Sequence, residues 1–341
     1  MAELPALPVG DALPALRRAL ADGAAAVLTA PPGSGKTTLV PLALLDEPWL
    51  DGRRILMLEP RRLATRQAAA RMASLRGEAP GGTVGYAMRF ERRVGPTTRI
   101  EILTEGLFVR RLQDDPALDG VGLVIFDEFH ERSLDADLGL ALVREVQSSL
   151  NPALRLLVMS ATLDAQPVAG YLGGASIVSA TGRQHTVTLH HRPEATPAEV
   201  VREALDRHGG DILVFLPGAA EIARQAVALE GCAAAVHRLH GGLARAAQDR
   251  ALQPSPGRRK VVLATNIAET SLTIEGVEVV IDSGLARRSR YSPRTGMSRL
   301  ETVRVSRASA EQRAGRAGRL VPGHAYRLWP EAESRGLAAV D

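Results

Sequence analysis

The sequence has a single cysteine, Cys232, and aromatic residues make up only 3% of it. One cysteine excludes a disulfide within the chain, which fits a reducing compartment. With so few rings, the cores must be built from Ala, Leu and Val. The N-terminus shows no basic-then-apolar signal pattern, and no apolar run approaches the length of a membrane span. We therefore expect a cytoplasmic protein with no membrane partner.

Lysine is also scarce: Lys36 and Lys260 are the only two among 42 lysine and arginine residues, in a chain of net charge +4. The excess of arginine has two explanations. It can reflect a general Arg- and Ala-rich composition, or it can serve contacts with phosphate, whose geometry matches the guanidinium fork. Net charge alone does not decide between them. One of the two lysines lies in a glycine-rich loop, where a point charge suits a phosphate.

At 341 residues, with 45% apolar and 23% charged side chains, the chain is long enough for two domains with full cores. Strand and helix patterns alternate in its first half. Continuous apolar runs such as 121–128 are typical of strands buried on both faces. This alternation predicts an α/β fold with a parallel, doubly wound sheet. Strands are expected at 27–29, 53–59, 83–90, 99–104, 121–128 and 154–162, and helices at 11–22, 36–45, 63–75, 106–115 and 134–150.

The alternation breaks between residues 173 and 197 and then restarts. Strands are expected at 211–218, 233–239, 258–266 and 277–284, with a helix at 219–230. A segment rich in Pro, Thr and charge separates the halves. We therefore predict a first domain at 1–180, a linker or edge segment with a strand inside it at 181–197, and a second domain of the same architecture at 198–341.

The stretch APPGSGKTT, residues 30–38, follows a short strand and precedes a helix. Glycines let such a backbone curl so that its N–H groups point at phosphate oxygens, and the helix N-terminus adds its dipole. Lys36 would reach the outer phosphates and the Thr37 hydroxyl would ligate Mg²⁺. Ala30 stands where the strict pattern has glycine. The alternative is a glycine-rich turn with a solvated lysine. The predicted phosphate-binding residues are Gly33, Ser34, Gly35, Lys36, Thr37 and Thr38.

The sequence DEFH, residues 127–130, ends another buried strand. Asp127 can hold Mg²⁺, and Glu128 can orient and deprotonate an attacking water. With Thr37, these two carboxylates form the predicted metal set. The alternative is an acidic N-cap of the next helix. A lone histidine such as His130 is usually a surface or packing residue. Ser160 and Thr162, in the sequence SAT, could link the metal site to the cleft, or they could form a simple turn.

Eight stretches together resemble, in order and spacing, the motif series of the superfamily 2 DEAH-box helicases. The DEFH sequence and the phosphate loop are similar to those of the bacterial HrpB-type branch. The resemblance covers nearly the whole chain. Its stretches are APPGSGKTT (30–38), LEPRRLATR (58–66), LTEGLF (103–108), DEFHER (127–132), SATL (160–163), LVFLPG (213–218), ATNIAETSLTI (264–274) and QRAGRAGR (312–319).

The resemblance implies two tandem RecA-like domains that hydrolyse ATP between them. By this resemblance, Gln312 would position the attacking water, and Arg316 and Arg319 would be arginine fingers. Arginines from a second domain can complete the charge around a γ-phosphate. Arg71 resembles the family's arginine that stacks on the base. Glu275 lies where an acidic residue contacts the nucleotide, and Leu252 lies near the position of an apolar residue of the second domain that packs on the adenine. No aromatic residue with a glutamine precedes the phosphate loop, so any NTP could serve.

The resemblance also implies nucleic-acid contacts from residues in both halves of the chain. Contacts of this kind follow a single strand without reading its bases. These residues are Arg61, Arg62, Thr104, Thr265, Asn266 and Thr270. The segment 286–305 is expected to form a β-hairpin, which in this family wedges against a duplex or grips the strand. A surface hairpin with solvated arginines is the alternative. The residues do not decide between RNA and DNA; the family favours RNA, through contacts to 2′-hydroxyls.

Family members continue past the last motif into winged-helix, ratchet and oligonucleotide-binding domains, so we expect this sequence to be a fragment that still binds ATP. The main hypothesis is an NTP-dependent helicase core stepping 3′ to 5′, with the direction taken from the resemblance. One alternative is an ATP-gated clamp or remodeller that grips RNA without separating strands. Another is a different class of P-loop ATPase, which SAT and QRAGRAGR disfavour. The sequence identifies no protein partner.

Overall fold

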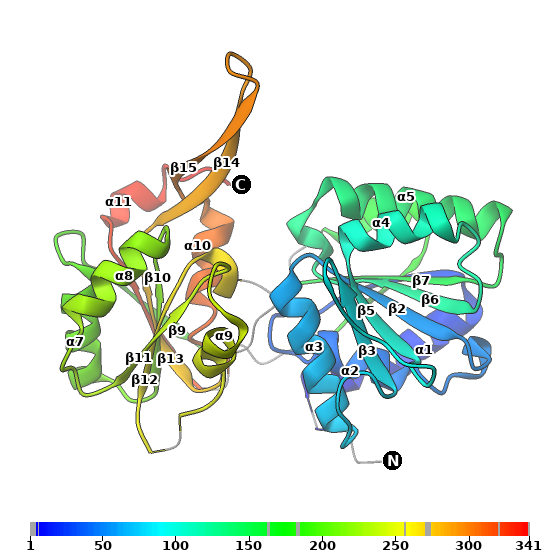
Figure 1. Ribbon diagram of the computed structural model, residues 1–341, viewed down its shortest axis with the longest axis horizontal. Coiled ribbons are helices and arrows are strands. Elements are labelled where there is room, and N and C mark those ends of the chain that lie inside the picture. The colour runs from blue at the N-terminus through cyan, green and yellow to red at the C-terminus, as the bar shows by residue number, and fades with distance from the viewer. Residues whose placement is uncertain are drawn as a thin grey trace. The chain divides into compact units, whose positions relative to one another are not determined.

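The computed structural model describes residues 5, 7–161, 164–181, 185–255, 257–269, 274–319 and 321–339. The chain divides into two compact units, residues 1–183 and 184–341. Each unit has its own central sheet with helices on its faces (Figure 1).

The first unit contains an eight-stranded sheet in the order β4–β3–β5–β2–β6–β7–β1–β8, parallel except for the β3–β4 pair. Side chains alternate between two cores, one on each face: Leu123 and Ile125 of β6 enter one, Val124 and Phe126 the other. The strands are β1 (Ala25–Thr29), β2 (Arg54–Glu59), β3 (Val84–Met88), β4 (Glu91–Arg93), β5 (Ile100–Thr104), β6 (Val121–Phe126), β7 (Arg155–Ser160) and β8 (Ser176–Ser179). The helices are α1 (Leu13–Asp22), α2 (Lys36–Ala43), α3 (Arg62–Leu75), α4 (Glu105–Asp114), α5 (Leu134–Ser149) and α6 (Ala165–Tyr171).

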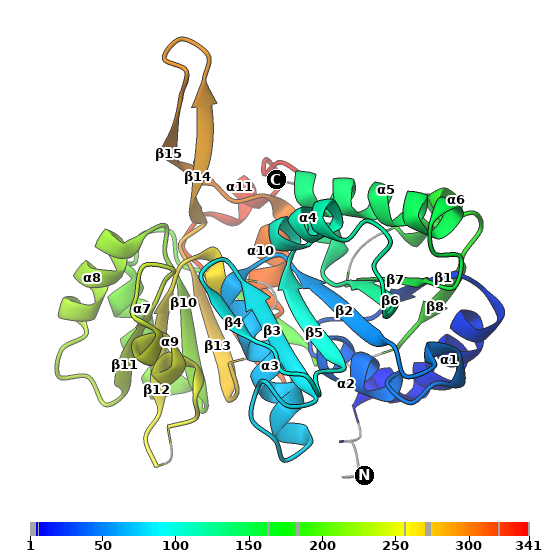
Figure 2. The same ribbon diagram turned by 45° about the vertical axis from the view of Figure 1, so that its right-hand side comes forward.

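The second unit contains a six-stranded parallel sheet in the order β11–β12–β10–β13–β16–β9. An antiparallel hairpin of β14 (Leu285–Ser292) and β15 (Met297–Arg304) projects from this unit (Figure 2). The sheet strands are β9 (Val187–His191), β10 (Asp211–Phe215), β11 (Ala235–Leu239), β12 (Lys260–Ala264), β13 (Val277–Asp282) and β16 (Gly323–Arg327). The helices are α7 (Pro197–Arg207), α8 (Ala219–Ala228), α9 (Arg245–Leu252), α10 (Arg307–Ala314) and α11 (Glu331–Ser334).

The predicted α/β class, with mainly parallel sheets and a hairpin in the second half, is confirmed. The strand expected inside 181–197 is β9, which pairs with β16. Two strands, β4 and β8, and five helices, α6, α7, α9, α10 and α11, were not predicted from the sequence, and most of them are short. Among the described residues, no helix combines the length and the apolar character that crossing a bilayer requires.

Candidate nucleotide and nucleic-acid site

The phosphate loop joins β1 to α2, which begins at Lys36. Gly33 and Gly35 have φ of +80° and +91°, a region that side chains disfavour. A Cβ on Gly35 would also lie 2.7 Å from Leu7 Cδ1, so a larger residue there would force the Leu7 side chain to move. Ser34 is buried, and its hydroxyl has no hydrogen-bond partner within the described part of the chain. The Thr38 hydroxyl donates back to the Gly35 carbonyl at 3.4 Å.

Two carboxylates meet this loop from the end of β6. The Thr37 hydroxyl donates to Asp127 Oδ2 at 2.5 Å, and Lys36 Nζ donates to Glu128 Oε1 at 2.8 Å. Strands β1, β7 and β6 are adjacent and parallel, so their carboxyl ends share one edge of the sheet. This topology brings together groups that are about ninety residues apart in sequence.

The charged groups at this sheet edge shift one another's pKa values. Burial alone lowers the pKa of Lys36, but the charges of Glu128 and Asp127 outweigh it, and the pKa lies above its ordinary value. Burial raises the pKa of Asp127 to about 6, although Lys36 opposes the shift. The lysine is thus held charged, and its removal would leave buried carboxylates without their cation.

The backbone at Glu128 is strained. Its φ of +49° and ψ of +34° lie in the left-handed region, which a residue with a side chain enters at a cost. His130 follows, with Nδ1 3.4 Å from Glu128 Oε2. Burial lowers the pKa of His130, which keeps its ring neutral near pH 7. Strain of this kind concentrates where a side chain must be aimed, here toward the phosphate loop.

Glu59, the last residue of β2, was missed by the sequence analysis. Its side chain is fully buried, and neither carboxylate oxygen has a hydrogen-bond partner in the described structure. Because Leu58 is in register with Phe126, Glu59 lies beside Asp127 at the same sheet edge. Burial, followed by the charges of Asp127 and Glu128, raises its pKa well above the ordinary value. Only its position at the end of a buried strand could have indicated it.

The remaining predicted residues of the first unit lie at strand and helix ends. Ser160 is buried at the end of β7, and its carbonyl accepts the Ala30 N–H at 3.0 Å. Thr104 ends β5 and precedes α4. Arg61 precedes α3 and pairs with Glu131 at 2.9 Å. Arg62 and Arg71 lie on α3, both exposed. Thr162 lies outside the described residues.

In the second unit, Thr265 and the exposed Asn266 directly follow β12. Glu275 is exposed just before β13, and Leu252 is buried at the end of α9. Thr270 lies outside the part of the chain that the structure describes.

The stretch 312–319 starts in α10, which holds Gln312, and continues past the end of that helix. Arg316 is buried, and its guanidinium donates through Nε to the Glu269 carbonyl at 2.7 Å, with Nη2 also contacting this oxygen. Arg319 is half-buried. Both arginines lie around one small gap with Leu213, Ala268, Ile274 and Val277, and this gap is too small to hold a water molecule.

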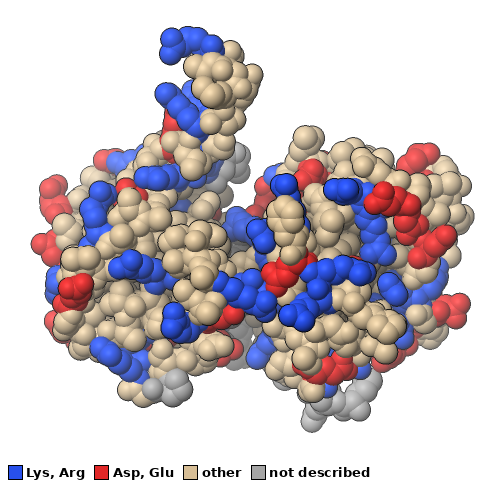
Figure 3. All heavy atoms as spheres, viewed as in Figure 1, with Lys and Arg blue, Asp and Glu red and all other residues tan. Residues whose placement is uncertain are grey.

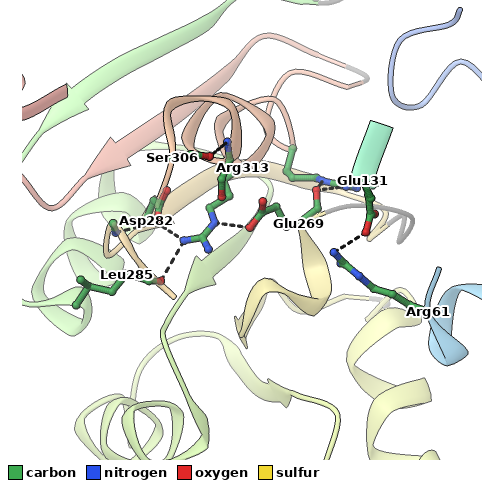
Figure 4. A network of polar contacts seen from close by, with 10 residues as sticks. Arg61, Glu131, Glu269, Asp282, Leu285, Ser306 and Arg313 are labelled. Carbon is green, nitrogen blue, oxygen red and sulfur yellow. Dashed lines mark hydrogen bonds and ion pairs between the residues drawn. The ribbon is translucent and has the colours of Figure 1, made fainter. Parts of the chain in front are cut away.

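Arg313, which the sequence analysis did not single out, is the most buried arginine of this stretch. It donates to Glu269 Oε2 at 2.9 Å and to Asp282 Oδ1 at 2.8 Å (Figure 4). The Phe215 ring lies 4.9 Å from its guanidinium carbon. Burial disfavours its charge, but the two carboxylates outweigh this and raise its pKa. Glu269 thus holds Arg313 with its side chain and Arg316 with its backbone.

A parallel sheet with a glycine-rich loop after one strand and paired carboxylates after another defines the class of P-loop nucleotide-binding proteins. Comparison with known families refines this. The DEAD/DEAH box helicase family model matches residues 12–169, and the helicase conserved C-terminal domain matches residues 196–321. The chain belongs to the DEAD/DEAH box helicases, and its similarity to HrpB makes it an HrpB-type member.

Similar curated proteins and solved structures support the same family. The chain is 48% identical over 344 residues to the ATP-dependent RNA helicase HrpB of Escherichia coli, covering 98% of this chain and 42% of the relative. It is 39% identical over 334 residues to a probable ATP-dependent RNA helicase DHX35 homolog of Caenorhabditis elegans, covering 90% and 45%. A crystal structure of E. coli DEAH/RHA helicase HrpB matches with a TM-score of 0.91 at 47% identity, covering 98% of this chain and 44% of that one. A second, of the E. coli DExH-box NTPase HrpB, has a TM-score of 0.83 at 47% identity, covering 100% and 43%. The chain therefore spans less than half the length of these relatives.

Proposed function

We propose that this chain is the NTP-dependent core of a nucleic-acid helicase or translocase, acting on RNA in the 3′-to-5′ direction. The observation that carries the proposal is the pairing of Lys36 with Glu128 and of Thr37 with Asp127 in the first unit. The family relationship to named RNA helicases supports RNA as the strand. Direction is inferred from the family alone.

In this proposal the residues of the phosphate loop bind the triphosphate. Gly33, Ser34 and Gly35 supply backbone N–H groups, and Lys36 exchanges its contact with Glu128 for a phosphate oxygen. Glu128, released from the lysine, accepts a proton from the attacking water. The exchange explains why this lysine and this carboxylate are both buried and hydrogen-bonded to each other beside the loop.

The same loop fits Mg²⁺. Thr37 and Asp127 offer a hydroxyl and a carboxylate that already contact each other, and oxygen donors of this kind suit that ion. Glu128 is the neighbouring carboxylate of the proposed metal set. When bound, the ion would neutralise part of the phosphate charge.

From the second unit, we propose that Gln312 orients the attacking water and that Arg316 and Arg319 neutralise charge developing on the γ-phosphate. Arg71 and Glu275 are proposed nucleotide contacts. Arg61, Arg62, Thr104, Thr265, Asn266 and Thr270 are proposed contacts to the sugar–phosphate backbone. Ser160 and Thr162 would couple nucleotide to strand. We also propose a first domain at 1–180, a linker or edge segment at 181–197 and a second domain at 198–341.

The test is an NTPase assay with and without single-stranded RNA or DNA, followed by a strand-separation assay. We expect turnover of ATP, GTP, CTP and UTP, stimulated more by RNA. Lys36→Ala should abolish nucleotide binding or turnover. Stimulation without strand separation would favour an ATP-gated RNA clamp instead. Turnover that no nucleic acid stimulates would contradict both functions, and strict ATP selectivity would contradict the expected tolerance of bases.

A further inference from the structure

Three histidines gather at one edge of the second unit's sheet, outside every residue set discussed above. His190 lies on the edge strand β9, His324 on its neighbour β16, and His208 directly follows α7. Thr188 is in register with His324 and His190 with Tyr326. Because side chains two residues apart share a face, His190 and His324 project from the same face of the sheet.

The three rings lie in contact, and the His324 ring stacks on that of His208 with centroids 3.9 Å apart and on that of His190 with centroids 5.4 Å apart. His190 Nε2 lies 3.2 Å from His324 Nδ1, and one ligand nitrogen from each of the three residues lies within 4.8 Å of the others. Nitrogens bound at about 2.0–2.1 Å to a tetrahedral ion are separated by about 3.3 Å. The His190–His324 pair is therefore already spaced as two ligands would be, whereas the His208 ring, stacked on His324, would have to turn for one of its nitrogens to face the same ion.

We propose that His190, His208 and His324 form a binding site for a transition-metal cation of the Zn²⁺ type, with a fourth position left to water. Imidazole is a preferred ligand of Zn²⁺, Co²⁺ and Ni²⁺. The ion would fasten the edge strand β9 to β16 and to the end of α7, elements that here are linked by the sheet pairing and ring contacts.

The surroundings also provide outer contacts of the kind such sites use. His208 Nε2 lies 2.7 Å from the Tyr326 hydroxyl, which leaves Nδ1 of that ring for an ion and gives this ligand an outer hydrogen-bond partner. Burial is the main factor that lowers the pKa of both His190 and His208, and this favours the neutral rings that metal binding requires.

Neighbouring charges limit the affinity. Arg192 and Arg207 lie close by, but both pair with Glu203, each at 2.9 Å. Two guanidinium groups against one carboxylate leave a net positive charge, which opposes a divalent cation. We therefore expect salt to strengthen metal binding modestly, since it screens this repulsion.

The experiment is a titration of the whole, chelator-treated chain with Co²⁺, followed by visible absorption, and with Zn²⁺, followed by calorimetry. We expect one equivalent of Co²⁺ to produce a ligand-field band and Zn²⁺ to displace it. Hydrogen exchange should slow on Zn²⁺ addition in residues 187–191 and 323–327. These readouts are independent of nucleotide turnover, so failure here leaves the proposed function standing.

Two variants, His324→Gln and His190→Gln, should each abolish the Co²⁺ band and the exchange protection. The matched control is His237→Gln, on β11 at the opposite edge of the same sheet, which should bind the metal unchanged. His190→Gln, on the edge strand, serves if His324→Gln fails to fold. No saturable binding by the parent chain, or equal binding by parent and both variants, would overturn the proposal.

Discussion

The three arginines in the stretch 312–319 have different surroundings, although they are evenly spaced in the sequence. Arg313 joins two buried carboxylates, Arg316 contacts a backbone carbonyl, and Arg319 is half-buried. The chemistry of the guanidinium is the same in each case. What differs is how deeply each charge is buried and which group it contacts, so substitution can separate a structural role from a proposed catalytic one.

We expect Arg313→Ala to destabilise the second unit by about 3–5 kcal/mol, because it leaves Glu269 and Asp282 buried without their cation. Denaturant unfolding measures this. Arg319→Ala, the comparison variant, removes a half-buried arginine, so it should destabilise the unit less than Arg313→Ala does, and it should bind nucleotide but lose hydrolysis. Parental turnover in Arg319→Ala would remove its proposed role as an arginine finger, and parental stability in Arg313→Ala would contradict the structural role of that residue.

Glu59 predicts an unusual dependence of stability on pH. Its pKa is raised in the folded chain, so the folded state holds the proton more tightly than the unfolded state does. Stability is therefore lost as the pH rises above the unfolded value near 4.5, and the cost persists above the folded value. Glu59→Gln removes that cost. We expect it to stabilise the chain at pH 8, on the order of 1 kcal/mol, and to have little effect near pH 4.

The control is the same substitution at Glu101, a buried residue of the adjacent strand β5 that does have a partner. Glu101 Oε2 accepts from Arg111 at 2.8 Å, so Glu101→Gln should destabilise the chain by about 1–3 kcal/mol at pH 8. Urea unfolding from pH 4 to 8 gives both profiles. A destabilised Glu59→Gln at pH 8 would mean that the buried carboxylate is compensated in the folded chain.

At the scale of elements, the sequence predicts strands and helices best where burial leaves a long, uniform pattern. The helix expected at 63–75 is α3, and the strand expected at 121–128 ends at Phe126, because the polar residues Asp127 and Glu128 leave the sheet. Helix α7 was missed although it carries a clear signal. Thr196 and Glu199 form a capping box, with Pro197 at the first helical position.

The β14–β15 hairpin carries a prediction of its own. Tyr291, Met297 and Leu300 are each more than 60% exposed, and basic side chains reach the tip (Figure 3). Replacing residues 290–299 with Asn-Gly keeps the Ser289–Leu300 pair and closes the strands with a tight turn. We expect unstimulated NTP turnover to persist. Single-strand affinity should fall about tenfold, as loss of one stacking contact predicts, and strand separation should be lost.

Fluorescence anisotropy and a duplex-separation assay measure these effects. The variant Arg290→Gln/Arg299→Gln keeps the hairpin but removes two of its charges, so it distinguishes a wedge from a charged grip. If the shortened hairpin separates strands as well as the parent chain does, the hairpin takes no part in the reaction, and Arg290 and Arg299 serve only their pairing with Glu301.

At the scale of the whole molecule, the motif order predicted the family and the groups that meet at the first unit's sheet edge. Sequence could not show which of them are buried, because burial depends on contacts between distant strands. Glu59 and Arg313 are examples: each stands inside a recognised motif, yet only packing distinguishes an unpartnered carboxyl or a buried ion pair from a surface charge.

The proposed catalytic groups are divided between the units: Lys36, Asp127 and Glu128 belong to the first, and Gln312, Arg316 and Arg319 to the second. Residues 1–183 have two cores of their own, so this unit should fold alone. We expect it to bind nucleotide by calorimetry but not to hydrolyse it. Adding residues 184–341 at micromolar concentration should restore little turnover, because a covalent link supplies an effective concentration in the millimolar range. Each unit must first show a cooperative melting transition. Hydrolysis by the first unit alone at the rate of the whole chain would place every catalytic group within residues 1–183, and the arginines of the second unit would then need another role.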